Sequence, residues 1–437
     1  MKSYILSVRY FHVKIPEKSP DFNTIINSDH VIMSADTIRY AEEYNRKYLH
    51  WDDLKYREFG ESNRMDVWRM MKIMRIMTYD HVRISNLELS YCVSNNYIQK
   101  TLHEIDSRIS SGFLTSDKID EKKRIILSIS SMMEESIASS QLEGASTTTK
   151  LAKKLLRSNI EPKDHSQRMI YNNYQAMQLL KEHLSEPLSP ELIKEIHMTI
   201  TDGPMDDPNS SGTFRTDDSV AVRDVYEDIT YHIPVKHEVI PDMVDDLCRY
   251  VNDEKEFVHP IIKGIIIHYI LAYIHPFFDG NGRVSRALFY WYCSKKGYSM
   301  MEYLSLSKVI KNHRQRYDMA YLLSETDDDD ITYFILYNLR MISEAMDVFD
   351  SYLRKKMKEQ EDSKKGLEQY GLSFRQSQIV KDMMHDGEPV SQYELSVKYQ
   401  TSVPTIRRDL IKLMDVGLVR MSGKDGHRQL YVYDADR

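Results

Sequence analysis

The sequence predicts a mainly α-helical fold with a β-hairpin in its middle and a small unit of helices and strands at its C-terminal end. Apolar residues recur at helical spacing over most of the chain, most clearly in segments 261–274 and 283–296. Alternating apolar residues between 220 and 233 interrupt this pattern and predict the central hairpin. Segment 418–433 alternates around two glycines and predicts a second hairpin.

Length and charge limit the possible classes of function. The chain has 437 residues, so two or three domains are expected. Hydrophobic residues make up 41% of it, which is enough for a sizeable core. Its 59 basic and 66 acidic residues give a net charge of -7, so the chain as a whole shows no bias toward nucleic acid or a membrane. Any such contact has to come from a local patch.

Cysteine usage and hydropathy predict a cytoplasmic protein. Cys92, Cys248 and Cys293 lie far apart without CxxC spacing, which argues against a disulfide framework or a zinc site and fits a reducing compartment. The N-terminus has no apolar run followed by a small-residue cleavage site. Lys263 and His268 interrupt the longest apolar stretch, so we expect no membrane partner.

Residues 1–111 are expected to form a mostly helical accessory region. Segment 3–13 fits a strand or a first helix equally well. A basic, methionine-rich helix is expected at 65–77, with an apolar stripe from Met70 to Met77. Such a stripe is more often core filling than a binding surface. Nothing in this region carries chemistry.

Two expected helices in the middle of the chain flank a short loop. The first, 261–274, is nearly continuous Ile, Leu and Tyr and follows Pro260, which suits a first helical turn. The second, 283–296, is followed by Gly297, where a C-terminal cap would lie. The stretch across the loop reads His-Pro-Phe-Phe-Asp-Gly-Asn-Gly-Arg-Val-Ser-Arg, residues 275–286.

This stretch combines groups that suit a bound nucleotide. Residues 280–282 stand at the N-terminus of the second helix, where unpaired N–H groups and the helix dipole favour an anion. Arg283 and Arg286 are three residues apart and can hold further phosphate oxygens. A magnesium ion would let the Asp279 carboxylate lie beside those phosphates. His275 can take a proton from an incoming hydroxyl.

The same stretch resembles the Fic family (filamentation induced by cAMP), whose motif HxF(D/E)GNGRxxR it matches at every position. The resemblance implies a Fic-type helical bundle over residues 112–350, and transfer of a nucleotide monophosphate, usually AMP from ATP, to a Ser, Thr or Tyr hydroxyl of a target protein. It makes His275 the base and Asp279 the Mg²⁺ ligand. It assigns nucleotide binding to Gly280, Asn281, Gly282, Arg283 and Arg286. The Doc kinase branch has lysine at the second glycine, so Gly282 favours nucleotidyl transfer over kinase chemistry.

A second stretch resembles the inhibitory helix of one class of Fic proteins. A long helix expected at 119–144 ends in a match to the pattern (S/T)xxxE(G/N), formed by Ser139, Glu143 and Gly144. A glutamate next to Arg286 would pair with its guanidinium and occupy the γ-phosphate position. The resemblance implies autoinhibition by Glu143, and in some relatives this glutamate also helps to remove the modification. A surface glutamate at a helix end is the alternative.

The central hairpin resembles the Fic flap. Gly212, Phe214 and Arg215 match its opening, and residues 231–234 match its close. A hairpin edge beside the site could hold an extended target segment by main-chain hydrogen bonds. An ordinary surface hairpin is the alternative.

Two further clusters are interpreted as structural. His259, His268 and His275 are nine and seven residues apart, which fits no zinc pattern, and His268 is expected to be a satisfied core residue. The acidic run 327–330 is expected to be a solvated entry to a long helix, with Asp330 as its N-cap.

The C-terminal end is expected to form a charged linker, 351–371, and a winged helix, 372–437. Its third helix resembles the recognition helix of DeoR-type regulators. The residues that would contact DNA are Thr405, Arg407 and Arg408 in that helix and Lys424 or Arg428 in the wing. From residue 372 onward there are ten Lys and Arg against nine Asp and Glu, whereas a strong DNA binder shows a clearer basic face. DNA and protein contacts therefore stay equal alternatives.

The sequence as a whole predicts a protein adenylyltransferase that uses Mg²⁺ and ATP, modifies a target protein or itself, and is inhibited by Glu143. One rival is a DNA-binding transcription regulator that senses nucleotide, although such a sensor would not need His275. A second rival is a Fic enzyme that uses another nucleotide or removes AMP. The sequence leaves open whether the protein forms a homodimer.

Overall fold

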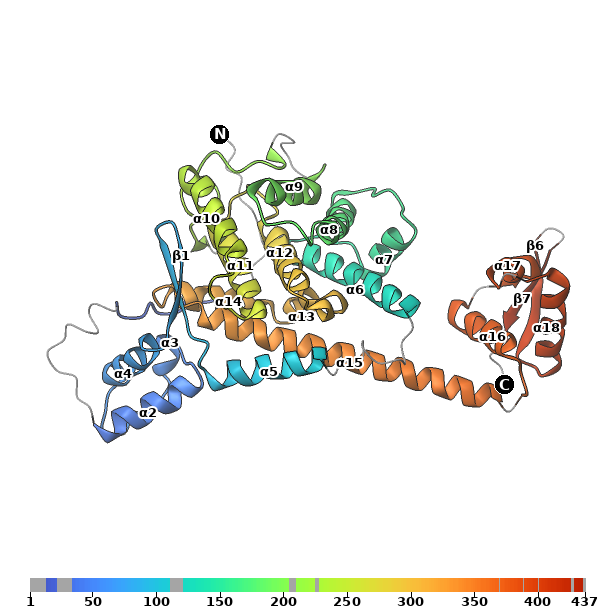
Figure 1. Ribbon diagram of the computed structural model, residues 1–437, viewed down its shortest axis with the longest axis horizontal. Helices are drawn as coiled ribbons and strands as arrows, with labels where there is room; N and C mark the ends of the chain where they lie inside the picture. Colours follow the sequence, from blue (N-terminus) through green and yellow to red (C-terminus); the bar gives the residue numbers. More distant parts are fainter. Residues whose placement is uncertain are drawn as a thin grey trace. The chain divides into compact units, whose positions relative to one another are not determined.

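The computed structural model describes residues 13–21, 34–110, 121–203, 210–224, 228–368, 370–387, 389–399, 401–425 and 428–434. These residues belong to two compact units, Met1–Asp347 and Val348–Arg437. Both consist mainly of α-helices with short antiparallel hairpins, which confirms the mainly helical fold (Figure 1). Of segment 3–13, all but Val13 lies outside the described residues. No helix in these described ranges has an apolar run long enough to cross a bilayer.

The N-terminal region of the larger unit contains a hairpin that the prediction of a mostly helical region missed. In chain order its elements are α2 (Ala35–Arg46), α3 (Trp51–Leu54), α4 (Arg64–Ile76), β1 (Asp80–Ile84), β2 (Leu87–Tyr91) and α5 (Asn96–Ser110). Both strands bury alternate residues, as strands with one covered face do. Each is only five residues long, so this alternation does not stand out in the sequence.

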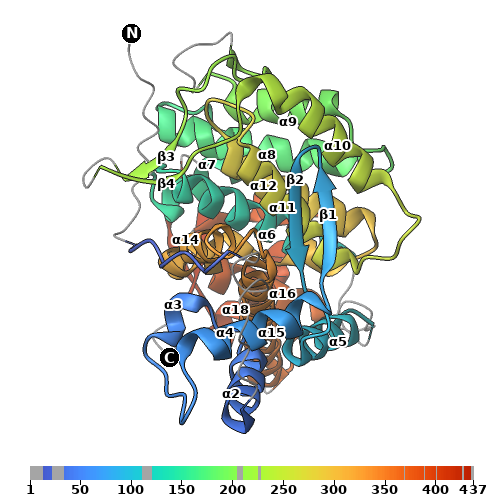
Figure 2. The same cartoon turned by 90° about the vertical axis from the view of Figure 1, so that its left-hand side faces the viewer.

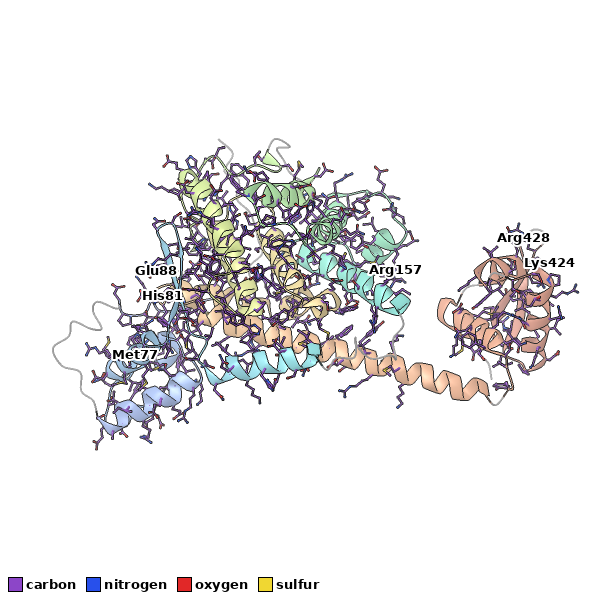
Figure 3. All side chains as sticks on the ribbon, in the orientation of Figure 1. Met77, His81, Glu88, Arg157, Lys424 and Arg428 are labelled. Carbon is purple, nitrogen blue, oxygen red and sulfur yellow. The ribbon has the colours of Figure 1, made fainter. Side chains whose placement is uncertain are left out.

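The methionine stripe of α4 fills the core along only part of its length. Met70 is 5% exposed, whereas Met77 at the end of the stripe is 82% exposed (Figure 3). His81 and Glu88, on the hairpin that follows, also reach the solvent, with their side chains 3.7 Å apart. The stripe is therefore core filling at its start and surface at its end.

The rest of the larger unit is a helical bundle around α11 and α12, which pack along each other (Figures 1 and 2). Its elements are α6 (Glu121–Leu142), α7 (Thr149–Arg157), α8 (His165–Glu182), α9 (Pro190–Thr201), β3 (Val222–Asp224), β4 (Ile229–His232), the 3₁₀ helix η3 (His237–Val239), α10 (Ile240–Asn252), α11 (Pro260–Ile274), α12 (Asn281–Lys295), the 3₁₀ helix η4 (Ser299–Tyr303), α13 (Leu306–Asn312) and α14 (Arg314–Glu325). Residues 261–271 of α11 are all buried, because apolar side chains cover the helix on every side. The loop between α11 and α12 is therefore held at one end of a buried helix pair.

Asp327 and Asp330 of the acidic run before the long helix α15 (Thr332–Glu368) are buried, whereas Asp328 is exposed, so the expectation of a solvated helix entry is wrong for these two residues. The Asp327 carboxylate lies 2.9 Å from the Lys72 ammonium and 3.5 Å from the Arg75 guanidinium. Asp330 accepts hydrogen bonds from the hydroxyls of Tyr48 at 2.7 Å and Tyr79 at 2.6 Å. Buried carboxylates need such partners, and here the N-terminal region supplies them.

Beyond α15, the described residues of the smaller unit form three helices and a three-stranded sheet. They are α16 (Phe374–Asp386), β5 (Val390–Ser391), α17 (Gln392–Lys398), α18 (Val403–Asp415), β6 (Val419–Asp425) and β7 (Arg428–Tyr433), with strand order β5-β7-β6. Arg407 and Arg408 on α18 are exposed, as are Lys424 and Arg428 on the β6–β7 hairpin (Figure 3). The assignment of this unit as a winged helix, and its binding of DNA or of a protein, stay predictions.

Candidate active site

The loop between α11 and α12 folds tightly because two of its residues adopt left-handed backbone conformations. His275 caps α11 with a φ of 52°, and Gly280 precedes α12 with a φ of 80°. The Asn281 side chain then bridges the loop: it accepts from the Phe277 N–H at 2.9 Å and donates to the Phe277 carbonyl at 2.8 Å. Both polar atoms of this side chain are used within the loop, and the backbone N–H of Asn281 stands at the start of α12 to offer an anion.

His275 has the tautomer of a general base. Its Nδ1 lies 3.2 Å from the Ala272 carbonyl oxygen, which can only accept, so Nδ1 carries the proton and Nε2 keeps a lone pair. Burial, followed by the neighbouring charge of His232, lowers the pKa of His275 to about 4. The ring is therefore neutral at physiological pH and lines the cavity in front of α12.

His197 of α9 supports this loop, and the sequence analysis missed it. Its ring stacks on the Phe277 ring with centroids 3.7 Å apart. The Gly212 N–H donates to its Nδ1 at 3.0 Å, so Nε2 carries the proton and donates to the Asp279 carbonyl at 2.9 Å. His197 thus connects Gly212 with the loop between α11 and α12. A histidine on an otherwise apolar helix face was its only signal, and that pattern usually denotes core.

Glu143 lies against Arg286 at the N-terminus of α12. Its Oε1 accepts from Arg286 Nη2 at 2.7 Å, while Ser139 holds the same guanidinium through its hydroxyl at 2.9 Å and its carbonyl at 3.1 Å. A Cβ at position 282 would lie 2.2 Å from Glu143 Oε1, so only glycine leaves room for this carboxylate. Burial raises the pKa of Glu143, but Arg286 and Arg314 outweigh it, and the pKa falls below its ordinary value. Gly144, with a φ of 98°, follows the end of α6.

Arg283 and Arg286 do not face the same space, although the sequence placed both on a phosphate. The Arg283 side chain is fully buried and donates to Asp279 Oδ2 at 3.1 Å and to the Ile200 carbonyl at 3.3 Å. Arg314 of α14 lines the cavity instead, beside Arg286. It donates to the Leu142 carbonyl at 2.8 Å, at the end of α6.

Asp279 has the properties of a ligand for a metal that arrives with a nucleotide. Its carboxylate is 34% exposed and lines the cavity. Within the described part of the chain, no group of three or more His, Cys, Asp or Glu side chains could hold a metal by itself. Magnesium in nucleotide sites commonly takes one or two carboxylates together with substrate phosphates. A single carboxylate therefore fits Mg²⁺ bound to a polyphosphate.

The flap is a short antiparallel hairpin, as predicted, in which Val222 pairs with His232 and Asp224 with Ile229. Arg215 attaches it to the loop between α11 and α12: its Nε donates to the His275 carbonyl at 3.0 Å, and its Nη2 donates to the Val235 carbonyl. The Phe214 ring lies 5.5 Å from the Phe277 ring. The cavity wall on this side also includes Val13, Ala221, Tyr231, Tyr273 and Tyr321.

His268 is a core residue, as expected. It is 2% exposed, and its Nε2 lies 2.9 Å from the Tyr317 hydroxyl. Burial lowers the pKa of His268 to about 3.

Comparisons with known proteins match this region. A profile of the Fic/DOC family matches residues 187–293. The chain is 34% identical over 111 residues to protein adenylyltransferase fic-1 of Caenorhabditis elegans, a match that covers 25% of this chain and 20% of that protein. It is 27% identical over 172 residues to protein adenylyltransferase Fic of Drosophila erecta, covering 37% of this chain and 31% of that protein. The chain therefore spans a third or less of the curated relatives that it matches.

Solved structures share the fold. A Fic family protein from Desulfovibrio desulfuricans superposes with a TM-score of 0.55 at 17% identity, covering 78% of this chain and 97% of that one. A fragment of Fic-1 from C. elegans superposes with a TM-score of 0.50 at 18% identity, covering 72% and 84%. Together with the matching profile, which includes the loop from His275 to Arg286, these similarities show that the chain carries a Fic domain.

Proposed function

We propose that the chain is a protein adenylyltransferase that transfers AMP from ATP to a hydroxyl of a target protein or of itself. The observation that supports this most directly is the neutral His275 ring, whose unprotonated Nε2 shares one cavity with the α12 N-terminus and Arg286. The names of the curated relatives point to the same activity.

The reaction is an in-line displacement. The target hydroxyl oxygen forms a bond to the α-phosphorus of ATP while its proton passes to His275 Nε2, and the bond to pyrophosphate breaks. The N–H groups at residues 280–282 and the Arg286 guanidinium stabilise the phosphate charge. Asp279 would hold Mg²⁺, which supplies further charge neutralisation when bound.

Glu143 would keep this activity low. Its carboxylate lies over Gly282 and occupies Arg286, so the terminal phosphate of ATP has to compete with it for the same guanidinium. Arg314 adds a second contact between the end of α6 and the cavity wall. Removal of the Glu143 side chain should therefore let the terminal phosphate of ATP bind Arg286 and raise the activity.

The test is mass spectrometry of the Glu143→Gly protein after incubation with each nucleoside triphosphate, because the added mass names the transferred group. We expect AMP. His275→Ala in the same background should abolish the addition. Incorporation that persists without His275 would remove the assigned base, and an added group other than AMP would favour an enzyme that uses another nucleotide.

A further inference from the structure

The flap strand β4 carries a histidine that the proposed reaction does not use. The His232 side chain is 11% exposed and lies between two other elements. Its Nδ1 is 3.0 Å from Glu325 Oε2 at the end of α14, and its Nε2 is 2.8 Å from the Tyr273 carbonyl oxygen in the last turn of α11. Tyr273 is two residues from His275, so this ring connects the flap directly to the turn that presents the base.

The two partners of His232 define its protonation. A backbone carbonyl and a carboxylate both accept hydrogen bonds, so each ring nitrogen has to donate, and only an imidazolium carries two N–H groups. A protonated Glu325 could donate to Nδ1 instead. Imidazole is the stronger base of the two, however, so the shared proton rests on the ring.

The charges around His232 agree with an imidazolium. Burial alone would lower the pKa of His232, but the hydrogen bond and charge of Glu325, the Tyr273 carbonyl and the charge of Asp329 outweigh burial and raise it. Burial, with Glu325 and Asp328 close by, raises the pKa of Asp329 itself to about 6, so its carboxylate forms as the pH rises toward neutrality and supports the cation. His275, the C-cap residue of α11, is neutral and adds no positive charge beside His232.

We propose that His232 is a positioning residue: as an imidazolium it fastens flap strand β4 to the C-terminal turn of α11 and to Glu325, and its deprotonation releases the flap from the catalytic loop. This inference rests on the proposed function, because the flap is argued to align the target hydroxyl with His275. Because the pKa of His232 is raised, the fastened state is fully present below the ordinary pKa of an imidazole and is lost as the pH rises through the pKa of the folded state.

The first experiment follows the rate of AMP incorporation from pH 5.5 to 9 in the Glu143→Gly background. We expect an alkaline loss of rate that moves to lower pH in Glu325→Gln, which keeps an acceptor for Nδ1 but removes the charge that stabilises the cation. His232→Gln should lose the alkaline limb altogether, because the amide does not titrate, and its rate should be about tenfold lower at pH 6.5. A residue with a merely structural role would lower the rate equally at every pH.

The matched control is Glu186→Gln. Glu186 also pairs with a histidine, His183, at 2.9 Å and raises its pKa, but neither residue lines the cavity. This variant should leave the pH profile unchanged. If Glu325→Gln behaves like the control, His232 is not the titrating group and the proposal is wrong.

A second measurement does not depend on activity. In ¹⁵N-histidine-labelled full-length protein, the His232 ring signals, assigned by their loss in His232→Gln, should report two protonated nitrogens at pH 6. A neutral ring at that pH would overturn the proposal. A Glu143→Gly parent that incorporates nothing would instead refute the proposed function, and the ring titration would still decide the state of His232.

Discussion

Replacing Glu143 by glutamine isolates the charge of the contact that is proposed to inhibit the enzyme. The variant keeps the shape of the side chain, so it changes little besides the ion pair with Arg286. The two groups are 2.7 Å apart, and their side chains are only 17% and 5% exposed. A hydrogen bond that involves a charged group contributes about 1.5–3 kcal/mol in such a setting. That range corresponds to about a tenfold to 150-fold change in how often a phosphate can displace the carboxylate.

The measurement is initial incorporation of label from [α-³²P]ATP, compared between wild type, Glu143→Gln and a control, Glu134→Gln. Glu134 lies on the same helix and pairs with Lys153 at 2.6 Å and Lys308 at 2.8 Å, away from the cavity. We expect at least about tenfold higher incorporation in Glu143→Gln and less than twofold change in the control. Equal rates in the three proteins would refute the reasoning that Glu143 competes with the nucleotide.

Three further predictions concern the base, the buried ion pair and the C-terminal unit. On the acid side of the pH profile, incorporation by the Glu143→Gly protein should fall as the pH drops through about 4, where His275 gains a proton; an acid loss centred near pH 6.5 would contradict the lowered pKa. Lys72→Met should destabilise the fold by about 3 kcal/mol in urea unfolding, because it leaves the buried Asp327 carboxylate with one cation 3.5 Å away, and a change below 1 kcal/mol would contradict this. If α18 binds DNA, the affinity measured by filter binding should fall steeply with salt concentration. Replacing both Arg407 and Arg408 by Ala should then reduce the slope of log affinity against log salt by about 2. An affinity that depends neither on salt nor on these two arginines would favour a protein partner.

The sequence analysis succeeded where the decisive signals lie within one or two turns of the chain. The loop from His275 to Arg286 was predictable because its glycines, its helix start and its apolar flanks are neighbours in sequence. The contact between Glu143 and Arg286 was expected from the family resemblance, and the structure contains it. Only the loop follows from a local residue pattern, because Glu143 and Arg286 are 143 residues apart in the sequence.

The remaining features depend on tertiary contacts. Arg314 lines the cavity where Arg283 was expected, because the direction of an arginine side chain depends on what else is buried beside it. The Ile200 carbonyl, which accepts a hydrogen bond from Arg283, belongs to a helix that is distant in the sequence. His197 and His232 likewise acquire their roles from carbonyls and carboxylates that lie far away along the chain. Periodicity cannot reveal such partners.

The buried carboxylates before α15 also bear on where this chain can be divided. Four of their partners lie ahead of residue 112, where sequence alone would begin the catalytic domain: Lys72, Arg75, Tyr48 and Tyr79. A fragment that starts there would contain Asp327 and Asp330 but would lack these two cations and two hydroxyls. The shortest piece expected to keep an intact interior therefore retains the N-terminal helices.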